Sequence, residues 1–316
     1  MALVDTQFVH GDTRLSVMSK LVRDLGVDTV VHAAVVVNNP SAGRALHETN
    51  VIGTMNVLAA CAGESSPVRR VVVKSSVGIY GAEPDDPSFM REEMAGRSSP
   101  RSPLVRDLLE MEQLVQDFGI RNPAATATVL RLGYKLGLRD QTPLTRYFSL
   151  PLVPTVAGFD PRIQLLHEED AIEALFRATV ADHPGVFNVS GDGVLLLSQA
   201  IKLAGRREFS LLPPYGRLLG RLVLRGAAGF NLPAPLLDFI TFGQVVDCSR
   251  LEEEFGWRPG YSTRSVVLDF AARTSQPMED LPVSAPQERE LQLYIRRRER
   301  MRQLPAARRA RRRRPA

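Results

Sequence analysis

Two serines and a tyrosine stand close together in the segment Val71–Gly81, which reads VVVKSSVGIYG. Its three consecutive valines predict a strand that is buried on both faces, as strands of parallel sheets are. Ser75 and Ser76 follow that strand, and Tyr80 lies four residues after Ser76. Hydroxyls at the carboxyl end of such a strand lie where open α/β sheets bind ligands. The segment therefore predicts a binding or catalytic site. The alternative is that both serines only satisfy backbone groups at the strand end.

The elements around this segment are expected to place it inside a sheet. Apolar spacing predicts helices over 14–25 and 42–62, with strands at 6–10 and 29–32. Together with the strand at 71–74 the order is βαβαβ, which predicts a parallel, doubly wound α/β sheet. The rest of the chain predicts strands over 127–132, 163–166 and 185–189, helices over 105–118, 167–179, 197–204, 248–255 and 265–273, a loop over 82–103, an irregular segment over 139–161 and an apolar helical lobe over 209–243.

Composition indicates a soluble globular protein. The chain has 316 residues, of which 44% are hydrophobic, and no apolar run is long enough to span a membrane. The first residues lack the charged and apolar regions of a signal peptide. Cys61 and Cys248 lie far apart and predict neither a disulfide framework nor a metal site. A cytoplasmic location is expected.

The net charge of +5 comes from the C-terminal end. Residues 296–316 hold eleven arginines and one acid, whereas the rest of the chain has 29 basic and 34 acidic residues. The folded part is therefore mildly acidic, and nothing in it predicts nucleic-acid binding. We expect residues 274–316 to form a linker and an arginine-rich tail that is disordered in isolation. A tail of this kind predicts a polyanionic partner, such as RNA or lipid headgroups.

The segment SSVGIYG resembles the serine-serine-x-x-valine-tyrosine-glycine segment of the extended short-chain dehydrogenase/reductase family, the nucleotide-sugar epimerases and dehydratases. Further matches follow in the family's order over residues 6–272, among them NVIGT at 50–54, LRLGYKLG at 130–137 and QLLHEED at 164–170. The resemblance implies a Rossmann-type NAD(P)-binding domain over 1–190 and a small substrate lobe over 191–273, interleaved with it. It also implies hydride transfer between a nicotinamide and a nucleotide-sugar.

The resemblance assigns several residues to the cofactor, which would be NAD or NADP: Asp12, Thr13, Ala33, Ala34, Asn50, Ser75 and Arg106. Asp12 is equally well explained as the N-cap of the helix that follows it. Asn50 is a poor residue for the middle of a helix, so we expect its amide first of all to tie that helix to neighbouring backbone.

The proton-transfer residues of the family pattern are incomplete. Ser76 matches the catalytic serine or threonine, but Leu104 and Leu108 occupy the positions of the catalytic tyrosine and lysine. Arg106 lies two residues beyond the tyrosine position and cannot act as a base at neutral pH. Tyr134 replaces a substrate-facing asparagine and is expected to contact substrate. The chemistry is therefore expected to be lost or much reduced.

The glycine-rich turn that holds a pyrophosphate is also absent from the sequence. By the family's order the chain begins at the third strand, which predicts an N-terminal truncation and an open edge at the strand 29–32. The family often pairs through helices equivalent to 42–62 and 105–118, so a homodimer is expected. The alternative function is that of a non-catalytic protein that binds a nucleotide or a partner.

Overall fold

The computed structural model describes residues 9, 17–36, 43–63, 66–87, 89–96, 102–138, 142–211 and 234–275. The chain divides into two compact units, residues 1–273 and 274–316. The predictions for a strand at 6–10, for Asp12 and Thr13, and for the tail beyond 275 fall outside the described residues, Val9 excepted. Across the described part of the chain, no helix has the length and apolar character that crossing a membrane requires.

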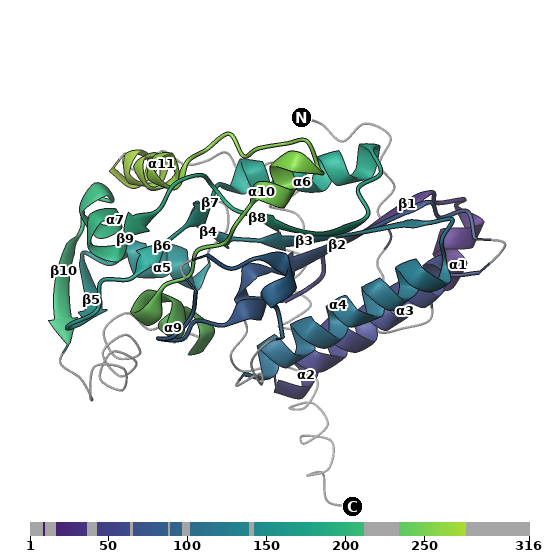
Figure 1. Cartoon of the computed structure of the whole chain (residues 1–316), viewed down its shortest axis with the longest axis horizontal. Coiled ribbons are helices and arrows are strands. Elements are labelled where there is room, and N and C mark those ends of the chain that lie inside the picture. The colour runs from purple at the N-terminus through teal and green to yellow at the C-terminus, as the bar shows by residue number, and fades with distance from the viewer. Residues whose placement is uncertain are drawn as a thin grey trace, which may run out of the picture. The chain divides into compact units, whose positions relative to one another are not determined.

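A four-stranded parallel sheet forms the centre of the first unit (Figure 1). Its strands in spatial order are β1 (Thr29–His32), β2 (Arg70–Ser76), β3 (Thr126–Leu132) and β8 (Gly185–Val189). Val72 of β2 pairs with Val31 of β1 and with Thr128 of β3. Among the described residues β1 pairs only with β2. The predicted α/β class with a parallel sheet is confirmed.

Strand β2 is buried on both faces, as its valines predicted. Val71, Val72 and Val73 are each 0% exposed. Side chains alternate along a strand, so Val71 and Val73 join one apolar cluster and Val72 joins another on the opposite face. This burial fixes the register of β2, because a shift by one residue would exchange the two faces. The two serines at its end are therefore held in place by the packing of the valines.

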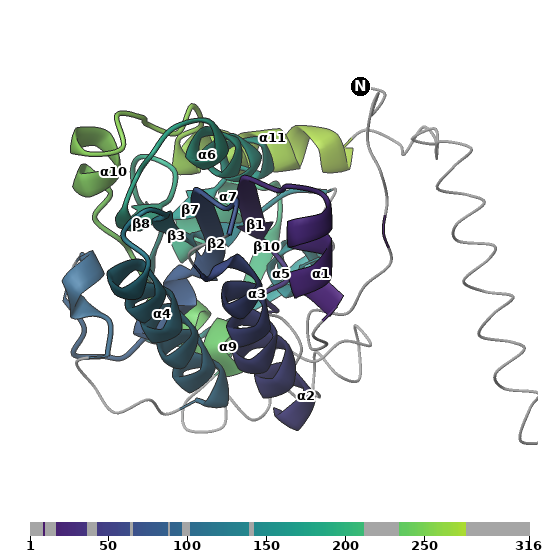
Figure 2. The ribbon, with the colours of Figure 1, turned by 90° about the vertical axis from the view of Figure 1, so that its right-hand side faces the viewer.

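Helices cover both faces of the sheet (Figure 2). The first face carries α1 (Val17–Asp24), α3 (Gly53–Cys61) and α4 (Pro103–Arg121). The second face carries α6 (Glu168–Val180) and α10 (Ser249–Glu253). Parallel sheets need such cover on both sides, and this arrangement leaves the carboxyl ends of the strands for a site.

The predicted helix over 42–62 is helical but not uniform. It consists of α2 (Gly43–His47), a π-helical turn η1 (Glu48–Ile52) and α3. Asn50 lies in the π turn, where its amide oxygen accepts from the backbone N–H of Val36 at 2.8 Å and its amide nitrogen donates to the Val36 carbonyl at 2.9 Å. This is the tie to neighbouring backbone that the position of Asn50 predicted.

The remaining elements form a second apolar core around Tyr147, Phe148 and Phe239. They are α5 (Pro143–Ser149), β4 (Tyr134–Lys135), β5 (Leu152–Val156), β6 (Arg162–Ile163), β7 (Leu165–Leu166), β9 (Leu195–Leu196), α7 (Leu197–Leu203), α9 (Ala234–Phe242) and α11 (Thr263–Ser275). Strand β10 (Arg207–Leu211) pairs with β5.

One prediction for this second core was wrong, and another was confirmed only in part. The segment 139–161, expected to be irregular, contains α5 and β5. Helix α5 begins because the Thr142 side chain accepts from the backbone N–H of Thr145, and because proline suits its first position. The lobe 209–243, expected to be helical, opens with residues of β10, which pairs in parallel with β5. Only α9 at its end is helical among the described residues.

Candidate active and binding site

Ser76 ends β2 and caps the short 3-10 helix η2 (Val77–Tyr80) that follows it. Its hydroxyl oxygen accepts from the backbone N–H of Gly78 at 3.1 Å. Accepting this hydrogen bond occupies a lone pair of the oxygen and leaves the hydroxyl proton to be donated. The side chain is half-buried. Ser76 is therefore suited to donate a hydrogen bond at the carboxyl end of the sheet.

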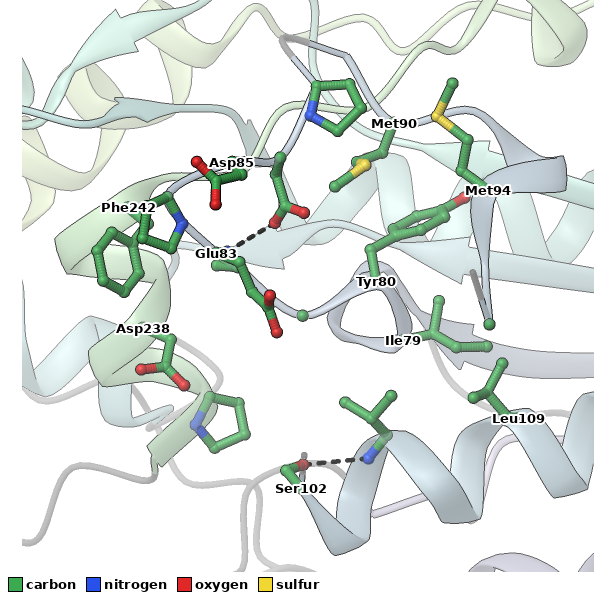
Figure 3. A pocket seen from close by; sticks show the side chains of 18 of the residues that line it. Ile79, Tyr80, Glu83, Asp85, Met90, Met94, Ser102, Leu109, Asp238 and Phe242 are labelled. Atoms are coloured by element: carbon green, nitrogen blue, oxygen red, sulfur yellow. Dashed lines mark hydrogen bonds between the residues drawn. The ribbon is translucent and has the colours of Figure 1, made fainter. Parts of the chain in front are cut away.

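A cavity of about 510 Å³ opens beside η2 (Figure 3). Its walls come from η2 and the segment that follows it, from the start of α4, from β4 and from α9: Ile79, Tyr80, Gly81, Ala82, Glu83, Pro84, Asp85, Asp86, Pro87, Met90, Met94, Gly96, Ser102, Val105, Leu109, Tyr134, Pro235, Asp238 and Phe242. Its size suits a small-molecule ligand, and its walls combine apolar surface with hydroxyls and carboxylates.

Tyr134 belongs both to this cavity and to the surroundings of Ser76. Its hydroxyl and that of Ser76 lie 3.8 Å and 3.3 Å from the point that a Cβ atom on Gly78 would occupy. The Tyr134 ring stacks on Phe239 with 3.9 Å between centroids, which holds it in place. Burial raises the pKa of Tyr134 above its usual value, so the phenol stays protonated at neutral pH. Tyr134 can donate a hydrogen bond beside Ser76 but cannot take up a proton.

Leu104 and Leu108 point into the protein. Leu108 is 0% exposed and Leu104 is 9% exposed, and both belong to the apolar cluster that includes Val73 and Ile79. Arg106 is exposed, on the side of α4 away from both leucines. The face of α4 that the family pattern assigns to tyrosine and lysine is thus closed by apolar packing and holds no titratable group at these two positions.

Five side chains, of which Tyr80 lines the cavity, form a polar network that the sequence alone did not reveal. Ser75 donates to Glu112 at 2.5 Å, and Glu112 binds Arg131 through contacts of 2.6 Å and 3.1 Å. Arg131 donates to the Tyr80 hydroxyl at 2.8 Å, which in turn donates to Asn188 at 2.7 Å. Burial raises the pKa of Tyr80 to about 12, although Arg131 opposes the shift.

The signal for this network was present in the sequence. A glutamate occupies a core position in the apolar stripe of α4, and an arginine interrupts the buried strand β3. Charged side chains are almost never fully buried unless they are paired. A buried Glu112 therefore predicts a buried cation beside it, and a buried Arg131 predicts a buried anion.

The remaining residues assigned to the cofactor lie in three different surroundings. Ala33 and Ala34 follow β1 and are exposed, and the backbone of Val36, two residues on, is held by Asn50. Ser75 is 2% exposed and lies in the buried network. The structure therefore places the two alanines beside the backbone that Asn50 binds, places Ser75 below the surface and leaves Arg106 exposed on α4.

His32 lies at the end of β1 and is 3% exposed. Its Nε2 lies 2.9 Å from the hydroxyl of Thr54, whose proton goes to the Asn50 carbonyl, so the neutral ring donates. Burial, with a smaller contribution from Lys74, lowers the pKa of His32 to about 4. Between pH 6.5 and 4 the unfolded chain therefore binds a proton that the folded chain does not. We expect this residue to lower the free energy of unfolding by about 3 kcal/mol between pH 7 and pH 4.

Urea denaturation of the wild type and of His32→Gln at both pH values measures this effect. Between pH 7 and pH 4 the wild type is expected to lose about 3 kcal/mol more of its free energy of unfolding than the variant loses. A difference that is independent of pH would show that His32 titrates normally.

The model of the NAD dependent epimerase/dehydratase family matches residues 2–190. The chain belongs to this family. An uncharacterized protein of Mycobacterium tuberculosis is 39% identical to it over 277 residues, which cover 87% of this chain and 73% of that protein. A UDP-glucose 4-epimerase of Yersinia pestis is 32% identical over 238 residues, which cover 71% of this chain and 68% of that protein.

Solved structures show the same fold as this member of the epimerase/dehydratase family. The UDP-glucose 4-epimerase of Thermotoga maritima, determined with UDP-glucose, superposes with a TM-score of 0.64 at 17% identity and covers 84% of each chain. The UDP-glucuronic acid 4-epimerase of Bacillus cereus, determined with NAD, gives a TM-score of 0.61 at 18% identity and covers 85% of this chain and 82% of that one. The resemblance to the extended short-chain dehydrogenases/reductases is confirmed.

Proposed function

We propose that this family member binds NAD or NADP together with a nucleotide-sugar, and that its epimerase- or dehydratase-type turnover is strongly reduced. The observation that carries the proposal is the contrast around Ser76. The hydroxyls of Ser76 and Tyr134 both lie within 4 Å of the point that a Cβ atom on Gly78 would occupy, and Tyr134 lines the cavity, whereas Leu104 and Leu108 fill the positions of the acid–base pair with buried apolar groups.

The end of β1 suits a dinucleotide. Ala33 and Ala34 are small and exposed, so a ligand can approach the backbone, and Asn50 keeps the neighbouring Val36 backbone rigid. When bound, the nicotinamide supplies the hydride acceptor or donor. Ser76 and Tyr134 then bind and orient the sugar oxygen by donating hydrogen bonds. Neither hydroxyl removes a proton at neutral pH, and this limits turnover.

Calorimetry with NAD and UDP-glucose, followed by chromatography of the sugar products, tests the proposal. We expect both ligands to bind and turnover to be about 10²–10⁴-fold slower than that of the Yersinia pestis enzyme measured in parallel, since positioned proton transfer contributes such a factor. Tyr134→Phe is expected to raise the Kd of UDP-glucose about 2- to 10-fold. The control is Tyr261→Phe, whose hydroxyl bonds Glu169 outside the cavity. Absence of binding, or turnover at the rate of the Yersinia enzyme, would refute the proposal.

A second candidate is a protein that binds these ligands without any turnover. The burial of Leu104 and Leu108 favours it, because no other tyrosine and lysine pair replaces them in the described part of the site. Binding with no product after prolonged incubation would select this candidate. The domain limits, the dimer, the cytoplasmic location, the polyanionic partner of the tail and the N-terminal truncation stay predictions.

A further inference from the structure

Arg131 lies almost at the end of β3 and is 3% exposed. Its Nε and Nη2 groups bind Glu112, which is 2% exposed, so the two buried charges compensate each other. The Nη1 group is not used by this pair. It donates instead to the hydroxyl of Tyr80 and to the backbone carbonyl of Glu92, both at 2.8 Å.

Both acceptors of Nη1 belong to the segment 80–94 that walls the cavity. Tyr80 lines the cavity itself, and Glu92 lies in η3 (Glu92–Met94), between Met90 and Met94, which also line it (Figure 3). Asn188 of β8 strengthens this attachment. It accepts from the Tyr80 hydroxyl, donates from its side chain to the Met90 carbonyl at 3.2 Å, and donates from its backbone to the Glu92 carboxylate at 2.8 Å.

The wall segment is also attached to residues 244–247, because the Met90 N–H donates to the Val245 carbonyl at 2.9 Å and Gln244 Nε2 donates to the Gly81 carbonyl. Its regular structure among the described residues consists of the end of η2 at Tyr80, the short turn η3 and an isolated parallel bridge between Met90 and Val246. Met90 packs in a small cluster with Val77 and Val246 rather than in one of the main cores. Loops without a core of their own open locally at low free-energy cost. The hydrogen bonds to Arg131 and Asn188 link this wall to strands β3 and β8 of the sheet, in addition to its attachment to residues 244–247.

We infer that Arg131 is a positioning residue for the cavity, because its guanidinium ties the wall segment 80–94 to β3 while Glu112 neutralises its charge. The part of this inference that concerns ligand affinity rests on the proposed function. Arginine suits the task because its planar fork presents donors in several directions at once. Lysine has one nitrogen and cannot hold Glu112 and the wall together.

Hydrogen exchange and ligand binding of Arg131→Lys test the inference. We expect peptides that cover residues 81–96 to exchange about tenfold faster without ligand, and the Kd of UDP-glucose to rise by about the same factor. The Kd of NAD is expected to stay unchanged. The matched control is Arg70→Lys, an arginine of β2 that pairs with Asp182 at 2.6 Å away from the wall. Unchanged exchange over 81–96 in Arg131→Lys would overturn the inference.

A triple variant separates positioning from general stability. Ser75→Ala, Glu112→Leu and Arg131→Met together replace the buried ion pair by apolar groups, which often restores stability. We expect its unfolding midpoint to lie near that of the wild type while exchange over 81–96 stays fast, because Tyr80 and Glu92 still lack their donor. Wild-type exchange in the stable triple variant would show that Arg131 only supports the fold. Hydrogen exchange is measured without ligand. It therefore tests the inference even if UDP-glucose does not bind and the proposed function is wrong.

Discussion

Glu112→Gln is expected to lower the free energy of unfolding by about 3–5 kcal/mol, because it leaves the guanidinium of Arg131 buried without a counter-charge. The two side chains are only 3% and 4% exposed. Water therefore cannot replace the lost carboxylate, and Arg131 cannot shed its proton at any accessible pH. Glutamine keeps the shape of the side chain, so the loss reports charge rather than packing. Urea denaturation followed by circular dichroism measures it.

The chain contains a matched control for this substitution. Glu173 pairs with Arg177 one turn apart on α6 at 2.7 Å, but these side chains are 43% and 44% exposed. Exposed pairs of this kind contribute about 0.3–0.5 kcal/mol, so Glu173→Gln is expected to have almost no effect. Equal effects of the two substitutions would mean that the Arg131 site is open to water, contrary to the burial described above.

The sheet could be predicted because its signals are local. The valines of β2 need only their own burial to form a strand, and the order of strands and helices then dictates parallel pairing. The position of Ser76 at the strand end follows from the same pattern. Its cap on Gly78 and its closeness to Tyr134 do not, because both depend on how η2 turns and on how β4 lies beside α9.

The elements that could not be predicted depend on distant partners. Strand β10 has a weak apolar pattern and exists because it pairs with β5, more than 50 residues earlier in the chain. Arg131 and Glu112 looked like isolated charges in a strand and a helix, and only the packing of α4 on β3 brings them together. A charged residue at a core position predicts a buried ion pair. The sequence identifies its partner only when few other core positions carry a charge.

Leu108→Lys is expected to lower the free energy of unfolding by about 3–5 kcal/mol at pH 7. It would restore the lysine of the family pattern, yet Leu108 is 0% exposed among apolar side chains of α4, β2 and η2. A lysine there loses the packing of the leucine and must either bury a charge or give up its proton. Gln113→Lys, at an exposed position of the same helix, is the control and is expected to change stability little.

The pH dependence of Leu108→Lys decides between a closed and an open face of α4. Burial would lower the pKa of the new lysine, so the penalty should shrink as the pH rises toward the ordinary lysine pKa of about 10.4, where the unfolded chain also loses its proton. A variant as stable as Gln113→Lys at both pH 7 and pH 10 would show that position 108 faces space in which a catalytic lysine can stand. The leucines would then not explain weak turnover, and Leu104→Tyr combined with Leu108→Lys should raise it. If instead the loss in free energy of unfolding becomes smaller as the pH rises, packing excludes the acid–base pair from this face of α4. Restoring the two residues alone then cannot restore proton transfer.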